Sequence, residues 1–379
     1  MPTTTTAAVL PAPGAAFELT ELELDEPGPG EALIELAATG ICHTDLSVAA
    51  SGIDPEIGVV LGHEGAGTVL ALGAGVSHLS AGDRVVLSYA HCDSCPACRG
   101  GRPAYCHASF GLNFAGRRLD GTTALRTGAG DPVGSHFFGQ SSFARRAVVD
   151  ASSAVPVDAS REELAVLAPL GCSVQTGAGT LLHALAPAAG LSVAIFGAGA
   201  VGLSALIAAP VAEAGPVFVV EPDPARRELA LELGAAEAID PAAGDPARAL
   251  RKLTGGGAGI AIDTVGSAEV IRSALASLRS PGRCATLALR TAANPVEIDQ
   301  RALLFGRTLE GVIEGDTVPA DFLPMLVGLW RQGRLPLERL IRTYPFDQIG
   351  RACEDARSGA TIKPVLTFGA ADEVERDDS

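Results

Sequence analysis

A glycine-rich turn in the middle of the chain constrains the fold more than any other segment. In "LSVAIFGAGAVGLSALIAA", Gly197, Gly199 and Gly202 form the pattern G-x-G-x-x-G between a short apolar run and a helical one. A second apolar run, "VFVV", follows and leads to Glu221, and "GIAIDTV" and "RCATLAL" supply further buried strands. Strand, turn, helix and strand make a βαβ unit. The sequence therefore predicts an α/β domain with a doubly wound parallel sheet.

The same segment predicts a dinucleotide site. The first glycine permits the turn, the second lets the backbone approach a pyrophosphate, and the third lets the helix pack on the strand. Glu221, nineteen residues past Gly202, can accept hydrogen bonds from the adenosine ribose. Its charge, with Asp223 close behind, would repel a 2′-phosphate, which favours NAD over NADP. Arg226 could add a ribose contact, although a lone arginine is more often a surface residue. A tight turn beside a solvated acid is the alternative interpretation.

The rest of the chain has a different pattern of apolar runs and turn residues. Up to about residue 155, glycine and proline separate short runs such as "EALIELAATG", "EGAGTVLALG" and "FARRAVVD", which is typical of an antiparallel, loop-rich β domain. Amphipathic helices and a strand, "KPVLTF", follow near the C-terminus, and the acidic tail "ADEVERDDS" is expected to fray. A chain of 379 residues has room for two such domains.

Charge and apolar patterning exclude some partners. The formal net charge of -16 argues against nucleic acid or an anionic membrane as the main partner, since both need an electropositive face; a local basic patch stays possible. The sequence has no apolar run long enough to span a membrane and no N-terminal secretory signal pattern. We therefore expect a cytoplasmic protein, in which clustered cysteines indicate a metal or catalytic site before a disulfide framework.

Four cysteines crowd into "HCDSCPACRGGRPAYC", at the spacing C-x2-C-x2-C-x7-C. They are Cys92, Cys95, Cys98 and Cys106. An iron–sulfur run begins in the same way, but its fourth cysteine follows after three residues and precedes proline, whereas Cys106 follows after seven and precedes His107. Four thiolates on one loop complete a tetrahedral zinc site and leave no open position, so the cluster predicts a structural zinc.

Cys42, His63 and Cys172 are a sparser set, and each lies among glycines that mark turns. Two cysteines and a histidine are the soft ligands of a catalytic zinc with an open fourth position. Taken singly, the cysteines could be small buried hydrophobes and the histidine a hydrogen-bonded core residue. Spacing alone does not join the three.

The motifs "GICHTDL", "VLGHEGAGTVLALGAGV", "GDRVV", "PLGCSVQTGAG" and "IFGAGAVGLSA", together with the four-cysteine lobe, resemble the zinc-dependent medium-chain alcohol dehydrogenases over about residues 15–368. "FFGQSSFA", "PLGCSVQTGAG" and "GVIEGDTVP" look most like the aryl (benzyl) and terpenoid alcohol dehydrogenases. The resemblance implies a GroES-like, mainly antiparallel β catalytic domain at 1–173 with its zinc lobe at about 91–107. It also implies an NAD-binding Rossmann domain at 174–312 and a return to the catalytic domain at 313–379.

The resemblance also implies two Zn2+ per subunit and a bound NAD. Cys42, His63 and Cys172 would ligate the catalytic zinc, and the four clustered cysteines the structural one. Asp45 resembles the carboxylate that orients the histidine ligand, and Glu64 resembles the acid behind the metal that can approach it.

Other residues match positions near substrate and cofactor. Thr44 matches the hydroxyl that hydrogen-bonds the substrate oxygen and starts a proton relay. Relatives often carry a histidine where this chain has Ser47, so the relay runs through water and the cofactor ribose, or another group finishes it. His43 and Lys363 are candidate phosphate contacts, and Thr176 would lie against the nicotinamide.

The implied activity is reversible oxidation of a small primary alcohol, aromatic or allylic, to its aldehyde by hydride transfer to NAD. Phe110, Phe114, Phe137 and Phe138 would suit such substrates, although each is as readily an ordinary core residue. A homo-oligomer, dimer or tetramer, is expected from the resemblance alone. The alternatives are a formaldehyde dehydrogenase acting on thiol adducts, a zinc-free reductase of the same superfamily, and a non-enzymatic zinc-binding module.

Overall fold

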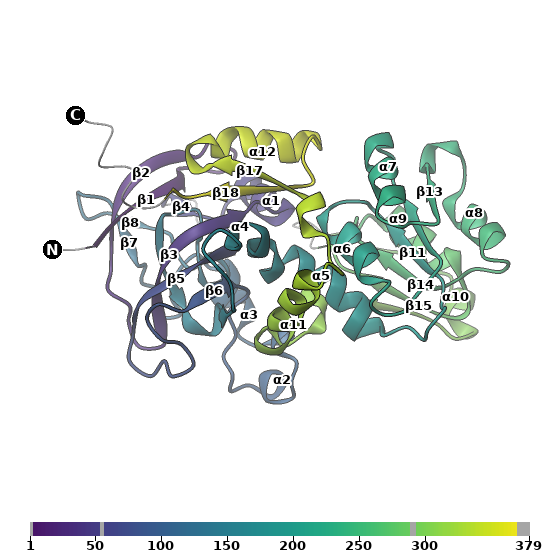
Figure 1. Ribbon diagram of the computed structural model, residues 1–379, viewed down its shortest axis with the longest axis horizontal. Coiled ribbons are helices and arrows are strands. Elements are labelled where there is room, and N and C mark those ends of the chain that lie inside the picture. Colours follow the sequence, from purple (N-terminus) through teal and green to yellow (C-terminus); the bar gives the residue numbers. More distant parts are fainter. Residues whose placement is uncertain (1–2, 54–56, 289–292, 370–379) are drawn as a thin grey trace. The chain divides into compact units, whose positions relative to one another are not determined.

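The computed structural model describes residues 3–53, 57–288 and 293–369, and the chain divides into two compact units (Figure 1). The first unit contains Met1–Cys172, Val318–Gly328 and Leu337–Ser379, and the second contains Ser173–Thr317 and Leu329–Pro336. The unit boundaries thus lie one residue before and five residues after the predicted domain boundaries, and 329–336 joins the second unit. The acidic tail at 371–379 lies outside the described residues.

The first unit holds two sheets whose strand orders are β4-β1-β2-β7-β8 and β10-β6-β5-β3-β18-β17, with β9 paired to β3. Their strands are β1 (Thr3–Leu10), β2 (Glu18–Leu24), β3 (Glu31–Gly40), β4 (Val59–Val60), β5 (Glu64–Leu72), β6 (Arg84–Leu87), β7 (Leu125–Arg126), β8 (Pro132–Val133), β9 (Arg146–Asp150), β10 (Ala154–Pro156), β17 (Ile341–Pro345) and β18 (Lys363–Thr367). The pairs are antiparallel except β17 with β18. The predicted mainly antiparallel domain is confirmed.

Short helices connect and flank these sheets. They are α1 (His43–Ser51), α2 (Pro96–Arg99), η1 (Pro103–Tyr105), α3 (Ser109–Phe114), η2 (Phe137–Gly139), η3 (Ala151–Ser153), α4 (Leu164–Leu167), η4 (Ala168–Gly171), η8 (Leu337–Arg339), η9 (Phe346–Gln348) and α12 (Ile349–Ser358). Helix α11 (Pro319–Arg331) follows the second unit's sheet in the chain. The core of the first unit is built from apolar side chains of both sheets, including Leu10 and Ile34, and from Phe143 in the segment before β9.

The ends of three neighbouring strands deliver the predicted metal ligands. Strand β3 ends two residues before Cys42, and β5 begins directly after His63, with Gly40 opposite Glu64 in the antiparallel register. Strand β6 is the next neighbour of β5, and Ser88 at its end donates a hydrogen bond of 2.7 Å from Oγ to the carbonyl of Gly171. A Cβ at Gly171 would lie 1.9 Å from the Leu87 carbonyl oxygen, so only glycine permits this approach. Cys172 is thereby held beside the other two strand ends.

The second unit contains a parallel sheet with the order β13-β12-β11-β14-β15-β16 (Figure 1). Its strands are β11 (Val193–Phe196), β12 (Val217–Val220), β13 (Glu237–Ile239), β14 (Ala258–Asp263), β15 (Leu278–Thr286) and β16 (Arg307–Gly311). Counted along the chain this is the order 3-2-1-4-5-6 of a doubly wound dinucleotide-binding fold. Each pair is parallel. The predicted Rossmann sheet is confirmed.

Several helices of this unit begin with a residue whose side chain caps the first turn. Its helices are α5 (Ser173–Gly179), η5 (Thr180–Leu185), α6 (Ala200–Ala208), α7 (Pro224–Glu232), η6 (Pro241–Ala243), α8 (Pro246–Leu253), α9 (Ala268–Ser277), α10 (Gln300–Leu304) and η7 (Glu314–Asp316). Asp223, Asp245, Ser267 and Asp299 each accept a backbone N–H in the first turn of α7, α8, α9 and α10. Such caps satisfy donors that the helix itself leaves unpaired.

Within the described ranges, no single helix has both the length and the apolar composition of a membrane span. One bent pair, Leu164–Gly171 with Ser173–Leu185, meets that criterion only when the two helices are taken together.

Candidate active site

Cys42, His63, Glu64 and Cys172 come together in the first unit. One potential metal-binding atom from each lies within 4.8 Å of all the others. His63 is 1% exposed, and its Nε2 has no hydrogen-bond partner among the described residues. A buried imidazole nitrogen is rarely left unpaired in a native protein. A zinc bound by Cys42, Cys172 and His63 would give Nε2 the bonding partner that it lacks. The donor set therefore fits the predicted metal.

Asp45 orients His63. Its carboxylate lies 2.8 Å from His63 Nδ1 and accepts backbone N–H groups of Cys42 and Gly62 at 2.9 and 3.2 Å. Because Asp45 is completely buried in the first turn of α1, these contacts fix the carboxylate. Nδ1 then carries the proton, and the Nε2 lone pair is directed to the metal position.

Electrostatics favour a thiolate at Cys42. The Cys172 thiol and the charges of Lys363 and His63 hold the pKa of Cys42 well below its usual value, against the effect of burial. Burial alone would lower the pKa of His63, but Asp45 and Cys42 raise it well above its usual value. Two thiolates balance the charge of a bound Zn2+, which leaves the ligand set close to neutral.

A buried ion pair lies behind the ligands. Lys363 Nζ is 2.9 Å from both carboxylate oxygens of Glu64 and donates to the Ile41 carbonyl at 3.1 Å. Lys363 is 3% exposed and Glu64 is fully buried. Burial lowers the pKa of Lys363, but the negative charge of Glu64 outweighs it, and the net shift is upward. This pairing is absent from the sequence interpretation; the predicted contact of Lys363 with cofactor phosphates stays a prediction.

Three further residues predicted near substrate and cofactor, His43, Thr44 and Ser47, lie on α1. Thr44 is half-buried, with Oγ1 3.9 Å from Cys42 Sγ. Ser47 is also half-buried, and its carbonyl accepts from Ser51 Oγ at 3.1 Å. His43 is exposed. A relay from Thr44 and a phosphate contact from His43 stay predictions.

The four phenylalanines of the sequence interpretation form one connected series. Phe138 stacks on His63 at a centroid distance of 4.4 Å, and Phe137 meets the same ring edge-on at 5.6 Å. Phe114 meets Phe138 edge-on at 5.0 Å, and Phe110 stacks on Phe114 at 5.6 Å. Phe110 is 79% exposed, whereas Phe137 and Phe138 are buried. The series therefore runs from His63, a candidate metal ligand, to the surface.

Gln140 is a buried residue of the site that sequence reasoning missed. Its Nε2 donates to the carbonyls of His63 at 3.0 Å and Ser88 at 2.8 Å, and its Oε1 accepts from Gly65 N at 3.1 Å. It thereby joins the strand ends that carry His63 and Cys172. Its presence in the motif "FFGQSSFA" was the available signal.

The four-cysteine lobe forms a second group whose sulfur atoms lie within 4.8 Å of one another. Backbone N–H groups of Cys92 and His107 donate to the sulfurs of Cys106 and Cys95 at 3.4 and 3.5 Å. Hydrogen bonds from Ser94 lower the pKa of Cys92 to about 5, whereas burial and the neighbouring thiols raise that of Cys98 to about 12. The four sulfurs cannot all ionise without a cation between them, so the lobe fits a structural zinc.

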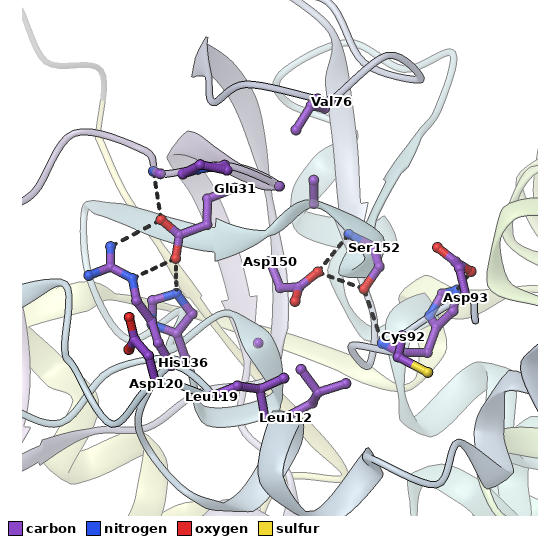
Figure 2. A pocket seen from close by; sticks show the side chains of 18 of the residues that line it. Glu31, Val76, Cys92, Asp93, Leu112, Leu119, Asp120, His136, Asp150 and Ser152 are labelled. Carbon is purple, nitrogen blue, oxygen red and sulfur yellow. Dashed lines mark hydrogen bonds and ion pairs between the residues drawn. The ribbon is translucent and has the colours of Figure 1, made fainter. Parts of the chain in front are cut away.

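A cavity of about 1030 Å3 in the first unit is a different feature (Figure 2). Its lining includes Cys92 but none of the catalytic candidates. Glu31 binds Arg118 Nε at 2.7 Å and His136 Nε2 at 2.9 Å on its wall. Because its polar groups pair with one another, we assign this wall a structural role rather than a catalytic one.

The glycine turn of the second unit has the geometry that a dinucleotide needs. Gly197 has a φ of 99°, and a Cβ at Gly202 would lie 1.9 Å from the Gly197 carbonyl oxygen. A Cβ at Gly199 would meet nothing within 4 Å, which leaves open space above the turn for a phosphate. Both observations fit a bound dinucleotide.

Glu221 follows β12 and is 5% exposed. Its carboxylate accepts the backbone N–H of Ala198, inside the turn, at 2.7 Å and that of Asp223 at 2.9 Å. Arg226 is half-buried and its Nε has no hydrogen-bond partner among the described residues; Arg227 instead donates to the Glu221 carbonyl at 2.8 Å. The ribose contacts of Glu221 and Arg226 stay predictions.

Comparisons with known proteins agree with this construction. The alcohol dehydrogenase GroES-like domain matches residues 28–159, and the zinc-binding dehydrogenase domain matches residues 200–329. The chain is 45% identical over 365 residues to geraniol dehydrogenase of Castellaniella defragrans, covering 96% of this chain and 97% of the relative.

Two further relatives cover nearly the whole chain. The crystal structure of benzyl alcohol dehydrogenase from Acinetobacter calcoaceticus is 40% identical with a TM-score of 0.91, covering 97% of this chain and 100% of that one. S-(hydroxymethyl)glutathione dehydrogenase of Haemophilus influenzae is 33% identical over 371 residues, covering 96% of this chain and 97% of the relative. Both domain models match, and both groups of candidate zinc ligands come together in the fold. The chain belongs to the zinc-dependent medium-chain alcohol dehydrogenase family.

Proposed function

We propose that the protein reversibly oxidises primary alcohols with an aromatic or allylic group next to the carbinol carbon, and that NAD accepts the hydride. The observation that carries this proposal is the phenylalanine series from His63 to Phe110. Aromatic walls favour flat, apolar substrates through burial and ring contacts. The geraniol and benzyl alcohol dehydrogenases among the relatives support the same substrate class.

The metal and cofactor assignments follow from the fitted sites. Cys42, His63 and Cys172 would hold one zinc and the four-cysteine lobe another, while the turn at 197–202 would hold the dinucleotide. When bound, the catalytic zinc supplies a Lewis acid for the alcohol oxygen and the dinucleotide supplies the hydride acceptor.

The chain's own residues perform the remaining tasks. Asp45 keeps His63 in the tautomer that offers Nε2. The Phe137 and Phe138 rings exclude water on the side of the imidazole that they cover. We assign the proton of the alcohol to Thr44 Oγ1, which accepts it as it passes its own hydroxyl proton on through water. Ser47 has no group that titrates near neutral pH and so cannot finish the relay as a base.

The preference for NAD rests on Glu221. Its carboxylate is held at the end of β12 by Ala198 and Asp223, so it cannot easily withdraw from an incoming 2′-phosphate. A phosphate would meet this fixed negative charge, whereas ribose hydroxyls would find an acceptor.

A comparison of kcat/KM for benzyl alcohol, geraniol, ethanol and a thiol–formaldehyde adduct, each with NAD and NADP, tests the proposal. We expect benzyl alcohol and geraniol to exceed ethanol by at least about tenfold, because their extra apolar surface is buried in the transition state. NAD should be preferred over NADP. Activity that depends strictly on the added thiol would instead indicate the formaldehyde dehydrogenase.

Phe110→Ala isolates the aromatic series from general effects of substitution. It should lower kcat/KM for geraniol more than for benzyl alcohol and leave ethanol unchanged, because only a long substrate reaches the outer end of the series. Leu253→Ala is the control, since Leu253 is an apolar residue that is 47% exposed at the end of α8 in the second unit. Equal losses for the three alcohols would contradict the substrate assignment.

We also propose a homo-oligomer in a reducing cytoplasm. Strand β16 is the edge of its sheet, and the exposed apolar side chains of Leu304 and Phe305 directly precede it, which suits pairing with a second copy. None of the eight cysteines, all of which are described, forms a disulfide. A sedimentation mass of one chain, or recovery in an oxidising compartment, would contradict these assignments.

A further inference from the structure

The phenylalanine series is carried by two short elements of the first unit. Phe110 and Phe114 lie on α3, and Phe137 and Phe138 lie on η2. Phe114 joins the two elements, because its ring meets that of Phe138 edge-on at 5.0 Å and that of Phe137 at 6.2 Å. The shape of this aromatic wall therefore depends on what holds α3 and η2 in place.

Helix α3 cannot hold its position by itself. It has six residues, contains Gly111, and follows Ala108, whose methyl group cannot cap it. An isolated helix of this length is unstable in water, and glycine weakens it further. On one side, Leu112 borders the cavity of the first unit, so this side of the helix offers little packing (Figure 2). The place of α3 must therefore be set by tertiary contacts.

Asn113 anchors α3 to the segment that follows β6. It is 1% exposed, its Oδ1 accepts the backbone N–H of Ala90 at 2.9 Å, and its Nδ2 donates to the Ala90 carbonyl at 3.0 Å. Nδ2 also donates to the Ser109 carbonyl, in the first turn of α3, at 2.9 Å. A buried amide that lost these partners would cost free energy, so the contacts fix α3 relative to Ala90.

Ala90 is also the contact point of η2. A Cβ at Gly139 would lie 2.6 Å from Ala90 Cβ, so only glycine permits this approach. Gly139 and the preceding Phe138 have φ values of 67° and 53°. Left-handed backbone at a phenylalanine is uncommon and persists only where the surroundings enforce it. Both elements of the phenylalanine series are therefore placed against the same residue.

The segment that contains Ala90 is itself fixed. The next residue, His91, donates its backbone N–H to Ser152 Oγ at 3.0 Å, and Ser152 Oγ donates to Asp150 Oδ1 at 2.7 Å. Asp150 is the last residue of β9, which pairs with β3. Asn113 therefore ties α3 to the sheet whose strand ends deliver the candidate metal ligands.

We propose that Asn113 is a positioning residue that sets the preference for long, flat alcohols, because it holds the rings of Phe110 and Phe114 against Phe138; this inference rests on the proposed function. Both amide protons of Asn113 are committed to backbone carbonyls, so it acts on the substrate through these rings and not by contact. Ethanol is too short to reach α3. Only substrates that extend along the series depend on Asn113.

Variants of the anchor and of the ring that it positions test this inference. Asn113→Leu keeps the size of the side chain and removes its hydrogen bonds, Phe114→Ala removes the ring between the two elements, and a double variant combines them. Asn113→Ala, which admits water to the Ala90 backbone groups, is used where the leucine variant does not fold. The values of kcat/KM for geraniol, benzyl alcohol and ethanol with NAD are measured together with hydrogen–deuterium exchange along the chain.

Thr5→Val is the matched control. Thr5 is 4% exposed on β1, and its Oγ1 also bonds both backbone groups of one residue: it accepts the N–H of Arg146 at 2.9 Å and donates to the Arg146 carbonyl at 3.0 Å. The control therefore removes the same kind of buried anchor from a part of the first unit that carries none of the four rings.

Asn113→Leu should lower kcat/KM for geraniol about three- to tenfold, which corresponds to about one aromatic contact, and that for ethanol by less than about twofold. Amide exchange should become faster in 109–114 and stay unchanged in β3 and β5. The double variant should lose no more activity toward geraniol than Phe114→Ala does, because Asn113 acts through that ring. Thr5→Val should keep the geraniol-to-ethanol ratio of the unmodified enzyme.

Equal losses for the three alcohols in Asn113→Leu, with faster exchange throughout the chain, would show a merely structural role and overturn the inference. Unchanged exchange in α3 would also overturn it, because the helix would not depend on this side chain. Additive losses in the double variant would overturn the action through Phe114. An unmodified enzyme that prefers ethanol to geraniol would instead reject the substrate class of the proposed function, and the exchange of α3 would still decide whether Asn113 holds the helix.

Discussion

His63 can offer Nε2 to a metal because Asp45 holds its other ring nitrogen at 2.8 Å. Asp45 is itself fixed by backbone donors on either side, from Cys42 and Gly62. The orientation of the ligand thus depends on a residue that touches neither substrate nor the open metal position. Loss of such an outer contact typically costs about 10- to 100-fold in metal affinity or activity.

Asp45→Asn should therefore lower the affinity for the catalytic zinc about 10- to 100-fold. The variant keeps the shape of the side chain but removes the charge that stabilises a protonated Nδ1. Zinc competition with a chelator measures the loss, and NADH binding should stay unchanged. Asp83→Asn, in an exposed turn that accepts from Ser80 N, is the control. Unaltered zinc affinity in Asp45→Asn would contradict the role given to this carboxylate.

The contacts of the buried acid Glu31 shift its pKa strongly and so predict how stability changes with pH. Burial alone would raise the pKa of Glu31, but hydrogen bonds from His136, Arg118 and Gly28 lower it to about 2. A folded-state pKa below the unfolded value of 4.5 stabilises the fold above pH 4.5, and that stability is lost as pH falls toward 2.

Glu31→Gln should accordingly lower the free energy of unfolding at pH 7 by about 2 kcal/mol, less than the full pKa shift implies because the pair is partly exposed. The difference from the unmodified protein should shrink as pH falls below about 4.5, measured by urea unfolding. Glu35→Gln, on the same strand with longer ion pairs to Arg146 and Arg161, should change stability by less than about 0.5 kcal/mol. A pH-independent difference for Glu31→Gln would contradict the assignment.

At the residue scale, sequence reasoning succeeded where a motif carries its own chemistry. Cys42, His63 and Cys172 were named in advance, and the structure brings them together. The pairing of Lys363 with Glu64 could not be foreseen, since 299 residues separate them. It arises because β18 pairs with β3 and β3 pairs with β5. No local pattern records that adjacency.

Among the elements, the four-cysteine lobe depends most on a metal. Its only regular structure is the short helices α2 and η1, and its sulfurs are held by backbone N–H groups and one another. So small a loop buries little apolar surface of its own. A bound zinc would supply the energy that orders it.

Cys95→Ser should therefore lose one zinc per chain and lower the thermal midpoint of unfolding, because a hydroxyl is a poor replacement for a thiolate ligand. Metal analysis and differential scanning calorimetry measure the two effects. Cys284→Ala, at a buried thiol outside both clusters, should retain two zincs. A Cys95→Ser protein that keeps two zincs and its stability, but loses turnover, would contradict a structural role for the lobe.

Strands and helices were predicted correctly where the apolar residues and their spacing along the sequence indicate the same element. The run "SVAIF" forms β11, and the helical run after the turn forms α6. The two-residue strands β7 and β8 were not foreseen, because so short a segment carries no periodic signal. Strand β15 begins at Leu278, five residues before the predicted run, because Leu278 pairs with Ala258 of β14; the irregular segment "RSPG" lies between this pair and the next, Ile260 with Arg283.

At the scale of the whole molecule, segments that are far apart in the sequence belong to one unit. The first unit takes segments from both sides of the Rossmann insertion, and 329–336 joins the second unit although it lies beyond the predicted boundary. The domain boundaries that the resemblance implies do not include this short return, which is decided by tertiary contacts. The candidate zinc ligands and the phenylalanine series lie in the first unit, and the candidate dinucleotide turn lies in the second.

Hydride transfer to NAD is the central claim, because it requires both the proposed catalytic zinc and the proposed cofactor. Deuterium is therefore followed from benzyl alcohol carrying two deuterium atoms at the carbinol carbon, with NAD and the zinc-loaded enzyme. Mass spectrometry should find one deuterium in the reduced cofactor and one in the aldehyde, while the alcohol proton is released to water. Reduced cofactor without deuterium, or an equal rate after both zincs are removed, would contradict the account.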